Sequence, residues 1–194
     1  MKTNINNIYL FRAMENYPWE LEKAVEALNY ALSYDPENIE ALCLMARVQW
    51  EQLGDYEMAK TYYEKAMASK IEAPSIYPDY ILVLIINQDY DEAQKVIDFA
   101  QTLKGIDRAI VQLRQAHLFE AQNNYQVAEK ALKEAKQLSM NNNFSSYVDE
   151  VLARVDKKRK EKNNADRAKE KEEKKDIEKE TANGWFKNRL NSLL

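Results

Sequence analysis

The chain has 194 residues, of which 45% are apolar, and a formal net charge of −4. This length allows one large domain, or one domain with a tail, and only three Gly and four Pro argue against a β-rich fold with many turns. Residues 1–155 carry 15 Lys and Arg against 23 Asp and Glu, an acidic excess that would repel phosphate and argues against nucleic acid as a partner.

The N-terminal segment and the cysteine content indicate the compartment. The first residues hold no apolar stretch long enough for a signal peptide, and the longest apolar run, residues 80–86, is too short to span a membrane. Cys43 is the single cysteine, so an internal disulfide is excluded and a reducing compartment is favoured. We therefore expect a cytoplasmic protein.

A pattern of small residues recurs four times along the chain. Its anchors are alanines spaced by 35, 34 and 35 residues, each followed seven residues later by a second alanine, with a larger apolar residue between them. Alanine lets two antiparallel helices approach closely, and the larger residue fills the gap to the next unit. The four triplets are Ala24/Leu28/Ala31, Ala59/Tyr63/Ala66, Ala93/Ile97/Ala100 and Ala128/Leu132/Ala135.

A turn precedes the anchor in three of the units, at Gly54-Asp55-Tyr56, Gln88-Asp89-Tyr90 and Asn123-Asn124-Tyr125. In this pattern the chain resembles the tetratricopeptide repeat (TPR) family, and the second unit matches best, through Trp50, Gly54, Tyr56, Ala59, Tyr63 and Ala66. The resemblance implies an all-α fold, an α-solenoid of about four helix-turn-helix units near 5–38, 40–73, 74–107 and 109–142. The match is incomplete, because Cys43 and Arg47 replace the family's first-helix tryptophan and glycine.

Proline positions predict two helix boundaries within the array. In the first unit we expect a helix over 4–16, followed by a second helix that begins at Pro18, where the missing N–H is tolerated. In the third unit, Pro78 near a helix start predicts a short first helix over 76–87.

After residue 143 the apolar residues form one helical stripe, which predicts a capping helix over 144–155 that covers the last unit. The cap is expected to continue into residues 156–182 as a solvated charged helix or linker, because residues 156–180 hold eleven cationic and nine acidic side chains and one large apolar residue.

The last residues, 183–194, form a short amphipathic segment. Asn183-Gly184 is expected to stop the helix, and the apolar residues after it predict a docking tail. This tail could dock in a groove of the same or a second copy, on another protein, or on a membrane surface. The membrane is the weaker alternative, because the segment has only two cations. The simplest alternative is a disordered tail. The tail residues are Trp185, Phe186, Leu190, Leu193 and Leu194.

In TPR arrays the first helices line a concave groove, so the resemblance implies which residues would contact a ligand. The lining would be mostly apolar and suited to an amphipathic or extended protein segment, although some of these residues could instead be ordinary core. The predicted lining is Tyr9, Leu10, Ala13, Leu44, Met45, Val48, Leu82, Ile85, Ile86, Leu113, Arg114 and His117.

The sequence contains no motif that is typical of a catalytic site. No Gly-rich phosphate loop is present, and the single histidine, His117, has no Cys or second His beside it to bind a metal. We therefore expect a protein-interaction scaffold without catalysis, metal or cofactor. The alternative is an adaptor that docks on itself or on a membrane through residues 185–194.

Overall fold

The computed structural model describes residues 8–191, with side chains placed through residue 167 and at Lys169 and Lys174. Within this range every regular element is a helix, so the all-α prediction is confirmed. In chain order the elements are α1 (Ile8–Asn16), α2 (Leu21–Tyr34), α3 (Ile39–Arg47) with the π-helix η1 (Val48–Leu53), α4 (Tyr56–Ser69), the 3₁₀-helix η2 (Pro74–Ile76), α5 (Tyr77–Ile86), α6 (Tyr90–Thr102), α7 (Arg108–Ala121), α8 (Tyr125–Leu138) and α9 (Asn142–Asn191).

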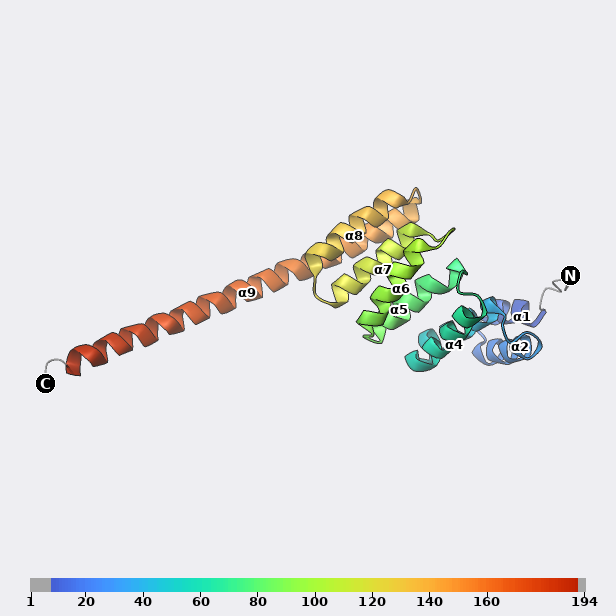
Figure 1. Ribbon diagram of the computed structural model, residues 1–194, viewed down its shortest axis with the longest axis horizontal. Coiled ribbons are helices and arrows are strands. Elements are labelled where there is room, and N and C mark those ends of the chain that lie inside the picture. The colour runs from blue at the N-terminus through green and yellow to red at the C-terminus, as the bar shows by residue number, and fades with distance from the viewer. Residues whose placement is uncertain (1–7, 192–194) are drawn as a thin grey trace.

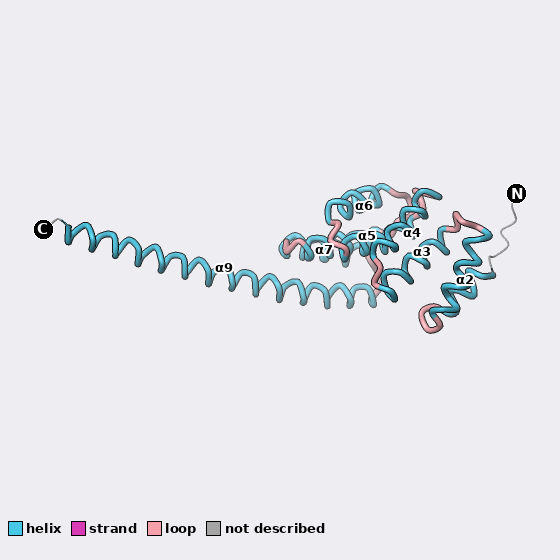
Figure 2. Tube along the Cα trace, turned by 90° about the horizontal axis from the view of Figure 1, so that it is seen from below, coloured by secondary structure: helices cyan, strands magenta, loops and turns pink. Residues whose placement is uncertain are grey.

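The helices stack as an α-solenoid of four hairpins. The pairs α1–α2, α3–α4, α5–α6 and α7–α8 each pack as a unit, and each unit contacts the next one along the chain. Figure 1 shows the hairpins side by side, with α9 leaving the array at the end opposite to α1 and α2. In Figure 2, α6 lies above α5 and α7.

The recurring alanines lie where helices approach most closely. Ala24, Ala59, Ala93 and Ala128 have no exposed surface, and neither have the alanines seven residues later. The larger residues between them are at most 1% exposed. A side chain longer than alanine at these positions would push the helices apart, so the spacing read from the sequence is the spacing of the packing contacts.

The three matching turns share one backbone conformation. Gly54, Gln88 and Asn123 all adopt the left-handed region, with φ of 68°, 67° and 60°. This conformation ends the first helix of each unit and lets the second helix return antiparallel to it. It is natural for glycine and tolerated by asparagine, but it is sterically unfavourable for glutamine.

Replacing Gln88 by glycine is therefore expected to stabilise the fold by roughly 0.5–1 kcal/mol, because it removes the strain at this exposed turn. Urea unfolding followed by circular dichroism measures the change. The matched control is Gln101→Gly, the same substitution at an exposed helical position of α6, which is expected to destabilise. If Gln88→Gly also destabilises, residue 88 is not strained.

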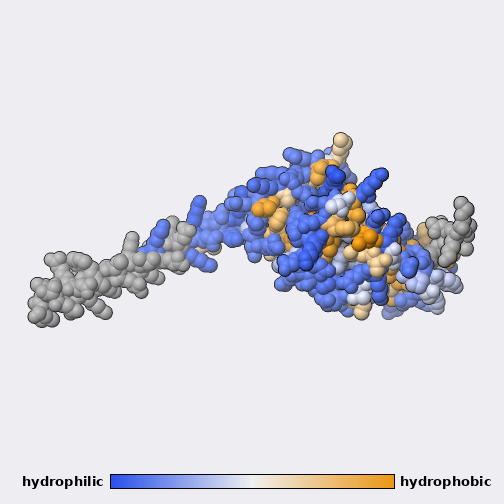
Figure 3. Space-filling view, in the orientation of Figure 1, coloured by the Kyte–Doolittle hydropathy of each residue, from blue (hydrophilic) through white to orange (hydrophobic). Residues whose placement is uncertain are grey.

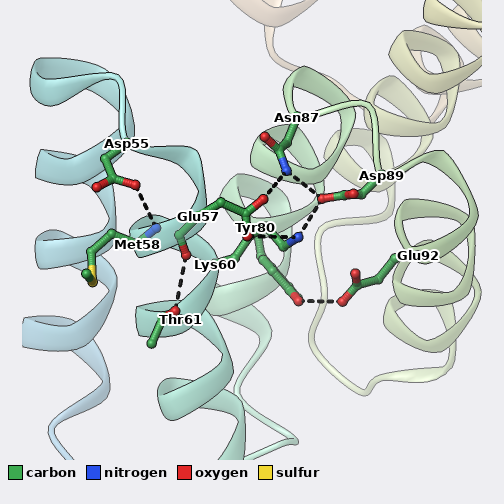
Figure 4. A network of polar contacts seen from close by, with 9 residues as sticks. All are labelled: Asp55, Glu57, Met58, Lys60, Thr61, Tyr80, Asn87, Asp89 and Glu92. Atoms are coloured by element: carbon green, nitrogen blue, oxygen red, sulfur yellow. Dashed lines mark hydrogen bonds and ion pairs between the residues drawn. The ribbon is translucent and has the colours of Figure 1, made fainter.

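A polar network joins the second and third units (Figure 4). Lys60 of α4 extends to the turn before α6, where its Nζ lies 2.6 Å from Asp89 Oδ2. Asn87 donates to the same carboxylate at 2.8 Å and to Glu57 Oε1 at 2.7 Å. Because only 15% of the Lys60 side chain is exposed, this ion pair is shielded from solvent and helps fix α4 against the following unit.

The first unit departs from its predicted helix boundaries. Residues 4–7 of the predicted first helix lie outside the described residues. Pro18 does not open the second helix, because residues 17–20 form a turn in which Glu20 N–H donates to Asn16 O at 2.8 Å, and α2 begins at Leu21. In the third unit, η2 and α5 together cover the short first helix predicted over 76–87, apart from its last residue.

The last helix continues from the predicted cap into the charged segment, as expected. Asn141 Oδ1 accepts hydrogen bonds from the N–H groups of Asn143 and Phe144, at 2.9 and 3.2 Å, which caps the start of α9. The helix then runs without a break to Asn191, so the stop expected at Asn183-Gly184 is wrong. A single glycine in a helix interior costs only about 1 kcal/mol relative to alanine, which is too little to end a helix by itself.

Apolar contacts hold the start of α9 on the array, through the buried Val148, Val151 and Val155. Charged contacts extend this docking beyond the predicted cap. Arg159 Nη1 lies 2.6 Å from Glu129 Oε2 of α8, and Lys162 Nζ donates to Asn123 O at 3.1 Å. Residues 157, 158 and 160–162 are nevertheless exposed, and Figure 3 shows the described surface beyond the array as hydrophilic.

Candidate functional site

A row of charges crosses three consecutive first helices. Asp79 of α5 lies between two arginines: Arg47 Nη2 of α3 is 2.5 Å from its Oδ2, and Arg114 Nη2 of α7 is 3.7 Å from its Oδ1. Arg114 Nε also donates to Pro78 O at 2.7 Å. Asp79 and Arg114 are one repeat apart in sequence, so the solenoid places them at the same position of neighbouring units.

Apolar surface borders this row. Leu82 and Ile86 follow Asp79 on α5 at i+3 and i+7, which puts all three on one side of the helix. Leu82 is half-buried, and Ile86 is 40% exposed. On α7, His117 follows Arg114 by one turn. We call Arg47, Asp79, Leu82, Ile86, Arg114 and His117 the inner face.

His117 is the most perturbed group of the inner face. Its Nδ1 is buried and finds no hydrogen-bond partner among the described residues. Burial lowers the pKa of His117 to about 4, and the nearby cations Arg114 and Arg154 act in the same direction, whereas Glu120 opposes them. The imidazole is therefore neutral at neutral pH.

A second charged contact joins α7 to α9 beside the inner face. Glu120 is only 8% exposed, and its carboxylate accepts from Arg154 Nε at 2.9 Å, from Arg154 Nη2 at 2.7 Å and from Lys158 Nζ at 2.8 Å. Burial alone would raise the pKa of Glu120, but these bonds hold it below its usual value. Glu120 and Arg154 are 34 residues apart, so α9 begins where the first helix of a fifth unit would lie.

The structure places most of the predicted groove lining inside the protein. Helices α1, α2 and α3 share one buried cluster, which includes Ala13 and Ala41, so its side chains fill the core and do not line a surface open to a ligand. Leu82, Ile86, Arg114 and His117 keep exposed surface. The buried residues of the predicted lining are Leu10, Ala13, Leu44, Met45, Val48, Ile85 and Leu113.

Tyr9 also keeps exposed surface, and it belongs to an aromatic cluster with α2. Its ring stacks on Tyr30 and Tyr34 of α2, with centroids 5.2 and 5.7 Å apart. The cluster joins α1 to α2 at the first end of the array. Tyr9 therefore does not contribute to the inner face.

The π-helix η1 changes the directions in which side chains point along the first helix of the second unit. Its wider turns hold more residues than the 3.6 of an α-helix, so side chains after Arg47 are rotated relative to an ideal helix. The sequence pattern contains no signal for this change. By contrast, the sequence does contain a signal for two ion pairs that were not predicted, Asp79–Arg114 and Glu120–Arg154. In each pair opposite charges stand about one repeat apart, and a solenoid brings such residues next to one another.

The predicted docking tail lies at and beyond the end of α9. Residues 185–191 belong to this helix, but the side chains of Trp185, Phe186 and Leu190 are not among those described. Leu193 and Leu194 lie outside the described residues altogether.

Cys43 is a free, partly buried cysteine on α3. Burial raises the pKa of Cys43 to about 12, so its thiol is protonated at neutral pH and is a poor nucleophile. Within the described part of the chain, no three His, Cys, Asp or Glu side chains converge as metal ligands would. None of the described helices is both long and apolar enough to cross a membrane.

Comparison with known proteins identifies the fold. No family model matches the sequence, and no curated protein matches it significantly. Among solved structures, it is similar to PilF of Pseudomonas aeruginosa (TM-score 0.67, 20% identity, 80% of this chain and 69% of that one). It is also similar to a tetratricopeptide repeat protein of Parabacteroides merdae (TM-score 0.62, 18% identity, 81% of this chain and 64% of that one). A third similar structure is MamA (TM-score 0.56, 14% identity, 79% of this chain and 87% of that one). Repeat spacing, packing and these neighbours agree: the chain has the fold of a tetratricopeptide repeat protein.

Proposed function

We propose that this protein is an interaction scaffold that binds an amphipathic segment of another protein on its inner face and catalyses no reaction. The observation that carries the proposal is the combination of Leu82 and Ile86 with the charged row across α3, α5 and α7. Apolar anchors beside ordered charges are typical of surfaces that bind peptides rather than transform them.

The charges favour a segment that carries acidic residues. Four cations lie on or beside the inner face, namely Arg47, Arg114, Arg154 and Lys158. Their carboxylate partners are Asp79, Glu120 and, 3.9 Å from Arg47 Nε, Glu51. Arg154 is half-exposed, so it can donate to a further carboxylate without breaking its bonds to Glu120. The expected ligand has one or two large apolar residues for α5 and an Asp or Glu for the arginines.

Rigid ordering of the row also supports binding. Arg114 is held by Asp79 and by Pro78 O, so a bound segment would not have to immobilise this side chain itself. His117 beside it is neutral and presents an aromatic ring with a polar edge. These features suit recognition, and they need no nucleophile or metal.

Selection from a display library of random peptides tests the proposal. The enriched peptides are expected to combine aromatic or long aliphatic residues with Asp or Glu, and to bind saturably to the purified protein. Leu82→Glu is expected to abolish their binding, and Arg114→Met is expected to weaken it roughly tenfold, since it removes one charged partner.

The matched control is Lys133→Glu, a charge reversal at an exposed position of α8 away from the inner face. It is expected to leave peptide binding and helicity unchanged. If the selected peptides bind Leu82→Glu and Arg114→Met as tightly as the unmodified protein, the inner face is not the binding site.

A further inference from the structure

A second surface lies at the other end of the array, on α2. A cavity of about 690 Å³ opens there between α2 and the end of η1. Tyr30 and Leu53 on its walls are 49% and 58% exposed, which is high for large apolar side chains. We call this cavity the α2 groove; it is lined by Leu21, Glu22, Val25, Glu26, Asn29, Tyr30, Ser33 and Leu53.

Two acidic side chains line this groove without a cationic partner in the described part of the chain. Glu22 and Glu26 are one helical turn apart on α2, where like charges repel. Neither forms an ion pair with any residue of the described range, and the neighbouring Lys23 is paired with Glu20. An apolar groove with unpaired carboxylates is complementary to an apolar segment that carries cations.

The chain itself contains such a segment. Residues 185–194 hold five large apolar residues, two cations and no acidic residue. Lys187 and Arg189 lie between the apolar residues Phe186 and Leu190, so a docked segment could place its cations beside its apolar anchors. The composition of the segment therefore matches the groove in both polarity and charge.

The path of α9 determines which copy supplies the segment. This helix has 50 residues, about 75 Å at about 1.5 Å per residue, and it leaves the array at the end opposite to α2 (Figure 1). Because α9 remains helical through residue 184, the same chain carries its C-terminal segment away from its own α2 groove. A second copy has no such restriction.

We propose that residues 185–194 of one copy dock in the α2 groove of a second copy, with Lys187 and Arg189 facing Glu22 and Glu26. This contact joins the tail of one molecule to the head of the next, so it gives either a closed dimer, in which two tails are exchanged, or a longer chain of molecules. It goes beyond the proposed function, because the α2 groove and the inner face are separate surfaces.

Charge reversal in the full-length protein tests the contact. Sedimentation equilibrium over a range of concentrations measures self-association of the unmodified chain, of Glu22→Lys/Glu26→Lys and of Lys187→Glu/Arg189→Glu. Each double variant is expected to self-associate roughly tenfold more weakly, because like charges then face each other across the contact. Combining all four substitutions in one chain restores opposite charges and is expected to recover self-association to within about threefold of the unmodified chain.

Three results would overturn the proposal. The first is an unmodified chain that stays monomeric at every concentration tested. The second is a pair of double variants that associate normally. In the third, the chain binds vesicles of phosphatidylcholine and phosphatidylserine, loses this binding with Lys187→Glu/Arg189→Glu and does not self-associate, which would assign the segment to a membrane instead. Peptide binding at the inner face is measured separately and is expected to survive the groove reversal Glu22→Lys/Glu26→Lys, so each proposal can fail alone.

Discussion

Leu44→Glu is expected to unfold the first two units. Leu44 is 7% exposed and packs among the core residues shared by α1, α2 and α3. The substitution removes the burial of a leucine and places a carboxylate in an apolar site, at a cost of at least about 4 kcal/mol. Since domains of this size are stabilised by only about 5–15 kcal/mol, much of the helical signal from this half of the array should be lost.

Circular dichroism and urea unfolding measure this effect, and Ile86→Glu is the control. Ile86 is 40% exposed on α5, so the same kind of substitution is expected to change the unfolding free energy by less than about 1 kcal/mol while it removes peptide binding. Comparing the two variants distinguishes a buried core residue from a residue of the binding surface. A folded, stable Leu44→Glu protein would mean that Leu44 faces a ligand groove after all.

Acidification is expected to destabilise the protein through His117. The pKa of this imidazole is about 4 in the folded state and ordinarily 6.5, because burial disfavours the charged form. Between these two values the unfolded chain binds more protons than the folded chain, so stability falls as the pH falls from 6.5 to 4. The full difference of roughly 2.5 pH units corresponds to about 3 kcal/mol.

Urea unfolding at several pH values measures this dependence, and His117→Gln isolates it. His117 is the single histidine of the chain, and the carboxylates titrate equally in both proteins, so their contribution cancels in the comparison. The unmodified protein is expected to lose about 3 kcal/mol more than His117→Gln between pH 7 and pH 4. Parallel stability curves for the two proteins would show that His117 is readily protonated in the folded state.

These two effects concern different parts of the solenoid. Leu44 stabilises the first two units, whereas His117 lies on α7 near the docking site of α9. In repeat proteins each unit contacts mainly its neighbours, so damage in one unit need not spread through the whole array. Helicity lost at Leu44→Glu should therefore be partial, and the α7–α9 end should remain folded.

The repeat register could be read from the sequence because it depends on local chemistry. Close helix packing requires small residues at fixed spacing, so the positions of Ala24, Ala59, Ala93 and Ala128 in the chain already mark where the helices touch. The turns could likewise be predicted, because Gly54 and Asn123 are residue types that tolerate the left-handed conformation. Fold class and the repeat period follow from these positions.

The candidate site required the tertiary structure, because it depends on how neighbouring units lie against one another. A helical stripe indicates which residues face inward, but not whether a neighbouring helix covers them; Leu44 is covered and Ile86 is not. The π-helix at Val48–Leu53 and the continuation of α9 past Gly184 likewise have no clear sequence signal. The sequence by itself determined the repeated unit and its spacing, which are short-range properties of helices. Only the tertiary structure decided which side chains remain exposed and which charges meet, because both depend on the distances between units.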